Sequence, residues 1–185
     1  MEYFLYICKK TQLDKLYNEL EFEKATSIYG RLRWMAKDDN SLEPIRQHLK
    51  LLINNYEKDH WENESQITDE QITESDIAEK VVSSESKFIQ RRKELIREKL
   101  KKNGLSQQDL AKLLGHRPNY MSELINGVRP FSRDDIIILH RLFKIKFEDL
   151  VPPFLKEEVS NHIKITLKEL KRNKAKLKLK DLETV

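Results

Sequence analysis

The 185-residue sequence has little cysteine, glycine or proline and no long apolar run. Its single cysteine, Cys8, excludes an internal disulfide framework and fits a reducing cytoplasm. Four glycines and five prolines supply few turn residues for a many-stranded sheet, so we expect an all-α fold. No apolar run approaches the ~18 residues needed to cross a bilayer, and the first residues lack the features of a signal peptide. The sequence therefore predicts a helical cytoplasmic protein with no membrane partner.

Charged side chains are abundant and unevenly divided along the chain. Residues 1–85 hold 11 basic and 18 acidic side chains, a net charge of −7. Residues 86–185 hold 24 basic and 13 acidic side chains, a net charge of +11. The basic half would attract a polyanion, although lysine-rich helices with solvated faces produce the same charge. This division favours two parts of the chain with different partners.

Apolar spacing and composition outline the parts on either side of residues 87–151. Residues 1–60 show helical periodicity and predict a helical hairpin region that binds a partner, because so few helices bury too little apolar surface alone. Residues 61–86 are rich in acidic, amide and hydroxyl side chains and predict an acidic linker, with a weak helix allowed around residues 69–82. Residues 152–185 form a basic C-terminal extension whose apolar spacing fits a helix or a strand. It either supports a dimer, clamps the DNA backbone or is a solvated tail. The pattern also leaves open whether residues 3–8 form a strand.

The most specific pattern lies in residues 87–151. After a basic helix, Ser106 and Asp109 form a capping box that opens a second helix. Gly115 supplies a left-handed turn residue, and Pro118 suits the first position of a third helix. Two short helices joined by such a turn form a helix-turn-helix, whose second helix lies in the major groove of DNA. Two further helices are expected before residue 151.

In the order, spacing and capping of its helices, this segment resembles the five-helix DNA-binding domain of the Cro/C1 (XRE) family. The resemblance implies contacts to the DNA backbone from four side chains: Gln107, Arg117, Asn126 and Arg129. It implies base contacts from Asn119, Tyr120 and Ser122, and asparagine pairs best with adenine. Pro118 departs from the family, because proline cannot hydrogen-bond a base there. Glu123 stands where a cation is common, and its carboxylate either accepts from cytosine or points to solvent.

A narrower resemblance joins the two halves of the chain. The pattern of residues 49–60, followed by a linker and by the helix-turn-helix ending at residues 124–132, resembles the HigA-type antitoxins. In that family the antitoxin binds HigB, a small ribosome-dependent mRNA endonuclease, and the complex represses its own operon. The resemblance implies a homodimer on operator DNA whose residues 1–60 bind a HigB-like ribonuclease toxin. The longer acidic linker and the tail depart from the family.

Two other functions fit the same residues. A stand-alone Cro/C1-type repressor would bind the same DNA but use residues 1–60 for a ligand or for self-association. An adaptor would use the five-helix fold for protein contacts alone. Catalysis is not expected, because the chain has no glycine-rich phosphate loop, and Cys8 has no activating neighbour beyond two lysines. Its five histidines lack metal-ligand spacing, so no metal or other cofactor is expected.

Overall fold

The computed structural model describes residues 14–37, 39–155 and 157–171. Every regular element within these residues is helical, which confirms the all-α prediction. The chain divides into two compact units, residues 1–150 and residues 151–185. Residues 3–8, for which the sequence leaves a strand open, lie outside the described residues.

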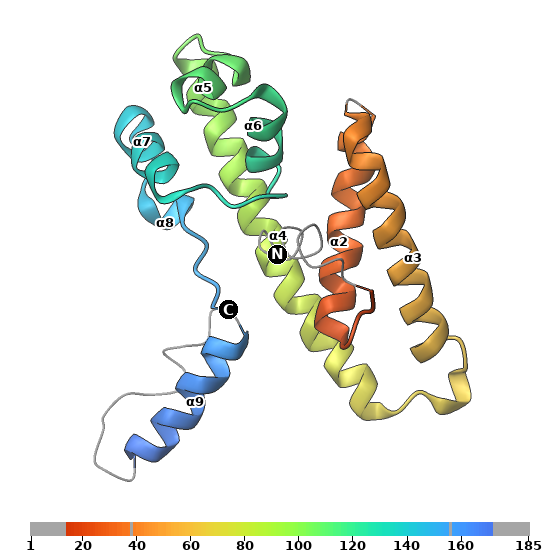
Figure 1. Ribbon diagram of the computed structural model, residues 1–185. Coiled ribbons are helices and arrows are strands. Elements are labelled where there is room, and N and C mark those ends of the chain that lie inside the picture. Colours follow the sequence, from red (N-terminus) through yellow and green to blue (C-terminus); the bar gives the residue numbers. More distant parts are fainter. Residues whose placement is uncertain (1–13, 38, 156, 172–185) are drawn as a thin grey trace. The chain divides into compact units, whose positions relative to one another are not determined.

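The first helices form a hairpin. Helix α2 (Glu19–Met35) is joined to α3 (Glu43–His60) through a short 3-10 turn, η1 (Asn40–Leu42), and the two helices pack along their length (Figure 1). Their spacing at three and four residues places apolar side chains on the shared face. The hairpin core contains Leu16, Ala25, Ile28, Leu32, Leu42, Leu49, Leu52, Ile53 and Tyr56.

A single long helix connects the hairpin to the rest of the unit. After η2 (Glu64–Gln66), helix α4 (Asp69–Lys102) begins at the N-cap Thr68 and continues without a break. The weak helix that the sequence allows at residues 69–82 is thus part of a continuous helix, which includes residues 69–86 of the expected linker. Helix α4 packs against α2, and its buried side chains up to residue 89 are Ala78, Val82, Glu85 and Ile89. This stripe is hard to recognise from composition, because it contains a small and a charged side chain.

The second half of α4 carries four shorter helices. These are α5 (Gln107–Leu113), α6 (Pro118–Ile125), α7 (Arg133–Phe143) and α8 (Phe147–Leu150). The expected capping boxes at Ser106 and Ser132 are both present, so the starts of α5 and α7 are as predicted. The helices enclose a second core that contains Ile96, Leu100, Leu110, Ala111, Met121, Leu124, Ile125, Phe131, Leu139, Phe143, Ile145 and Leu150.

A buried arginine ties α4 to the end of this group. Arg92 is only 1% exposed, and its Nη1 donates to the backbone oxygen of Leu150 at 3.3 Å. Its guanidinium lies 5.6 Å from the ring centroid of Phe88 and 5.0 Å from that of Phe131. Aromatic faces attract a cation and partly replace its lost hydration. Arg92 therefore stabilises the fold, although basic composition alone would place it in solvent.

The two cores meet at the residues that follow α6. Val128 is fully buried and belongs to the hairpin core. Arg31 of α2 donates to the Gly127 oxygen at 3.5 Å and to the Ser86 hydroxyl at 3.2 Å. Gly127 has φ +69°, and a Cβ there would lie 2.5 Å from Ile89 Cγ2. The hairpin thus covers part of its apolar surface with α4 and Val128 of the same chain.

The second unit contains helix α9 (Glu157–Lys171). The apolar spacing of residues 152–185 fits either a helix or a strand, and residues 157–171 form a helix. The lysine-rich residues beyond position 171 lie outside the described part of the chain. None of the described helices is long and apolar enough to cross a membrane.

Candidate nucleic-acid interface

The turn between α5 and α6 is held by backbone hydrogen bonds. Gly115 has φ +70°, and the His116 amide donates to the Ala111 oxygen at 2.8 Å, which closes the end of α5. Pro118 occupies the first turn of α6, as the sequence predicts. Met121 is fully buried and anchors α6 on the second core. The turn and the buried side of α6 therefore set the direction in which its other side chains point.

His116 holds the turn against α7. Its Nε2 lies 2.8 Å from the Oδ1 of Asp135, a buried carboxylate whose other oxygen accepts from the Ser132 amide. The His116 ring also lies 5.0 Å from that of Tyr120. No pattern in the sequence marks His116 and Asp135 as a pair. The capping box is the sequence feature that could have indicated this pair. It uses one oxygen of Asp135, so the other oxygen is available to accept from a neighbouring element.

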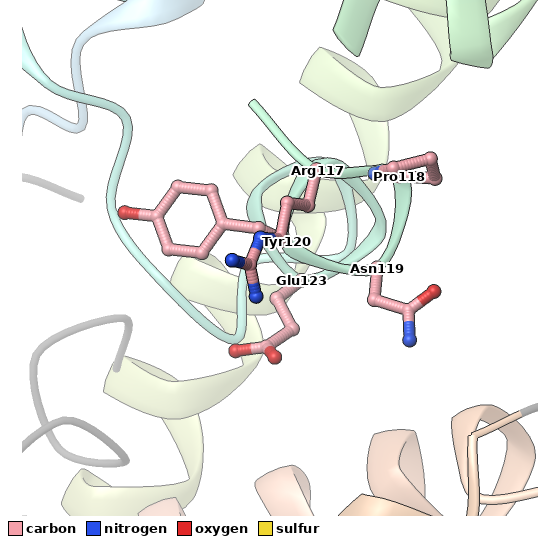
Figure 2. Close-up of a pocket in the computed structure, with 5 residues that line it drawn as sticks. All are labelled: Arg117, Pro118, Asn119, Tyr120 and Glu123. Atoms are coloured by element: carbon pink, nitrogen blue, oxygen red, sulfur yellow. The ribbon is translucent and has the colours of Figure 1, made fainter. Parts of the chain in front are cut away.

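The side of α6 that turns away from the core carries three of the seven predicted DNA-contacting residues. Arg117, Pro118, Asn119, Tyr120 and Glu123 line a pocket of ≈ 450 Å³ on this side (Figure 2). The first three of these side chains are exposed, and Tyr120 is half-buried. The exposed N-terminal end of a recognition helix is the part that reaches base edges in a helix-turn-helix.

Glu123 does not fill either role that the sequence leaves open. Its side chain is only 8% exposed, and its carboxylate pairs with Nε of Arg129. The Arg129 guanidinium also lies over the Tyr120 ring, 5.2 Å from the centroid. The carboxylate therefore positions Arg129 and neither points freely to solvent nor reaches toward a base. The spacing of residues along the sequence does not indicate that an ion pair will bury this carboxylate.

At the other end of α6, Asn126 links α6 to α4. Its Oδ1 accepts from Nζ of Lys93 at 2.7 Å, and its Nδ2 donates to the Ser122 backbone oxygen at 2.9 Å. Burial lowers the pKa of the Lys93 ammonium, and the nearby Arg97 lowers it further. Lys93 is thus a basic residue of α4 that lies beside the predicted phosphate contact. In the sequence, Lys93 is distinguished only as one residue of a basic helix.

Asn119 makes a contact with the N-terminal hairpin. Its Nδ2 donates to Oδ2 of Asp39, in the loop between α2 and α3, at 3.0 Å. Figure 2 shows the Asn119 amide pointing away from α6, toward that part of the chain. The side chain predicted to read adenine is therefore bonded to a carboxylate 80 positions earlier in the sequence.

The structure brings some of the predicted site residues together. Arg117, Asn119 and Tyr120 lie at the start of α6, whereas Asn126, at its C-cap, donates to the backbone oxygen of Ser122. The remaining two are Gln107, the first residue of α5, and Arg129, which follows α6. Among the described residues, no cluster of histidine, cysteine or acidic side chains could hold a metal ion.

Comparison with known families adds an independent observation. Residues 96–150 match the family described as Helix-turn-helix, of the Cro/C1 type. The predicted Cro/C1 resemblance is confirmed for this segment, and the match supports DNA-binding transcriptional regulation. Comparisons with curated proteins and with solved structures find no match. The HigA-type resemblance stays a prediction.

Proposed function

We propose that residues 87–151 bind operator DNA, with α6 in the major groove, and repress transcription. The observation that carries this proposal is the exposed N-terminal end of α6, presented by a helix-turn-helix whose opposite side is buried. The basic second half of α4 adds charge that favours DNA. The chain would act as one half of a symmetric homodimer on half-sites about one helical turn apart.

The proposed contacts fall into two classes. Asn119, Tyr120 and Ser122 would contact base edges, where the amide of Asn119 can pair with adenine. Backbone phosphates would be bound by Gln107, Arg117, Asn126 and Arg129. Lys93 supports this second class, because its ammonium lies 2.7 Å from Asn126. Phosphate contacts position the domain, and base contacts supply the sequence preference.

The proposal is tested by selecting duplexes from a random library with the full chain. We expect the selected duplex to bind at least about 10³-fold more tightly than unrelated DNA, with an affinity that falls steeply as salt rises. The mass of the complex should correspond to two chains on one duplex. Equal affinity for selected and unrelated duplexes, or no salt-dependent binding, would contradict the proposal.

We further propose that residues 1–60 bind and neutralise a HigB-type mRNA endonuclease toxin. The hairpin surface supports this second function, because Tyr17, Trp34 and Leu51 are 68%, 68% and 57% exposed. Large exposed apolar side chains are typical of protein interfaces. The net charge of −7 on residues 1–85 also complements a basic ribonuclease.

Co-expression with the adjacent reading frame tests this partner. We expect a small basic protein to co-purify with the chain, and Trp34→Ala to weaken its retention without changing operator affinity. If the chain elutes alone and the neighbouring product is not toxic when expressed alone, the antitoxin proposal fails. A stand-alone Cro/C1-type repressor then remains.

A further inference from the structure

The loop between α2 and α3 lies against the start of the recognition helix. Asp39 accepts a hydrogen bond from the Asn119 amide through Oδ2, at 3.0 Å. Its other oxygen, Oδ1, accepts from the amide and hydroxyl of Ser41 at 3.0 and 2.6 Å. The carboxylate is thereby oriented by its own loop while it contacts α6.

The hairpin is held in this position by further contacts, made from α2. Arg31 donates to the Gly127 oxygen and to Ser86, and the Ser27 and Ser86 hydroxyls lie 3.3 Å apart. Val128, directly after α6, is fully buried in the hairpin core. The hairpin is thus anchored on α4 and on the residues that follow α6. The contact at Asp39 is an exposed one at its far end.

The position of Asp39 conflicts with the docking proposed above. A base edge that pairs with Asn119 must approach its amide to hydrogen-bonding distance, where the Asp39 carboxylate now lies. The carboxylate would also face the phosphates with a like charge. Since the Asn119 side chain points toward DNA in that docking, the hairpin loop lies on the DNA side of α6.

We infer that the hairpin loop blocks the DNA-binding surface of its own chain, and that Asp39 competes with DNA for Asn119. This inference rests on the proposed operator binding and assigns a regulatory role to residues 1–60. The described structure is the closed form, and DNA binds an open form in which Asp39 has left Asn119. The observed association constant then equals that of the open form multiplied by the fraction of chains that are open. A weaker contact between Asp39 and Asn119 raises this fraction and therefore tightens DNA binding.

The test measures binding of the full chain to unrelated duplex DNA, where Asn119 makes no specific base contact. Asp39→Ala and Asn119→Ala each remove the same closing hydrogen bond. We expect each variant to bind about fivefold more tightly than wild type, the factor that corresponds to one such bond. The double variant should gain no more than either single variant, because both changes remove one interaction.

The alternative is simple repulsion between Asp39 and phosphates. In that case Asp39→Ala raises the affinity for DNA and Asn119→Ala does not. The double variant Asp39→Ala/Asn119→Ala then shows the same increase as Asp39→Ala. That pattern, or no gain from Asp39→Ala, would overturn the inference. Asp39→Asn is the matched variant, because its one oxygen can accept from Ser41 while its NH2 group donates to the Asn119 oxygen once the Asn119 amide turns over. It should therefore gain less than Asp39→Ala. If wild type and variants all lack salt-dependent binding, the proposed operator binding fails instead.

A distance measurement tests opening directly. Spin labels are attached in the full chain at Lys37→Cys, beside the hairpin loop, and at Lys112→Cys, on the exposed side of α5. Cys8→Ser removes the natural cysteine. We expect the distance between the labels to lengthen when the selected duplex is bound. An unchanged distance in the DNA complex would show that the hairpin stays in place, which overturns the inference.

Discussion

The guanidinium of Arg129 pairs with the buried carboxylate of Glu123 and lies over the ring of Tyr120. This arrangement gives one arginine two functions. It neutralises a carboxylate that is shielded from solvent, and it presents positive charge beside α6. Its contribution to stability and its proposed contact with DNA can therefore be measured separately.

Arg129→Ala should lower the free energy of unfolding by about 1–3 kcal/mol, because it leaves the Glu123 carboxylate without its cation. It should also weaken binding to every duplex and flatten the salt slope by about 1. Urea unfolding and binding titrations at several salt concentrations measure the two effects. The double variant Arg129→Ala/Glu123→Gln should recover most of the stability and none of the lost phosphate contact. Recovery of wild-type affinity in that variant would argue against a phosphate contact by Arg129.

Asn119→Ala should reduce discrimination at one base pair of the selected duplex by about 1–3 kcal/mol. The salt dependence of binding should be unchanged, because the amide carries no charge. Arg117→Ala is the comparison, since its exposed side chain precedes α6 by one residue. That variant should weaken binding to all sequences alike. A preference profile identical to wild type in Asn119→Ala would refute the base contact.

Gly127→Ala should destabilise the unit more than Gly104→Ala. Both glycines have positive φ, +69° and +66°, so both substitutions strain the backbone. Only at Gly127 does the new Cβ approach Ile89, at 2.5 and 2.9 Å, whereas nothing lies within 4 Å at Gly104. We expect an additional loss of about 1–3 kcal/mol at Gly127, measured by urea unfolding. Equal losses at the two sites would mean that the Ile89 side chain moves aside without cost.

Glu23→Gln should stabilise the protein at neutral pH. Burial, together with Glu79 and Glu19, raises the pKa of the Glu23 carboxyl in the folded state. A raised pKa means that the folded state binds the proton more tightly, so this group stabilises the fold at acid pH and the benefit is lost as pH rises through the raised pKa. The gain should be at most about 1 kcal/mol, because solvent screens the half-buried group.

Unfolding measured from acid to neutral pH checks this prediction. Glu23→Gln should match wild type below the ordinary range of a glutamate and exceed it near neutrality. Glu57→Gln, on an exposed position of α3, controls for the loss of one negative charge. A gain of equal size at acid and neutral pH would show that titration of Glu23 is not the cause.

The sequence by itself determined the local geometry of the helix-turn-helix. The capping boxes at Ser106 and Ser132, the left-handed turn at Gly115 and Pro118 at the start of α6 all act within a few residues. Such signals depend on backbone hydrogen bonds and steric limits that neighbouring residues set. The positions of α5 and α6, and hence the exposed start of the recognition helix, follow from them.

The burial of charged side chains and the position of the hairpin depend on contacts that local spacing does not encode. Arg92 is buried because Phe131 and Leu150, far along the chain, supply an aromatic face and a backbone acceptor, and Glu123 is buried because Arg129 pairs with it. Helix α4 packs against α2 along a stripe of mixed chemistry, so the sequence indicates only a weak helix at residues 69–82. Asp39 meets Asn119 because Val128 and Arg31 hold the hairpin on α4, a contact that no local pattern encodes.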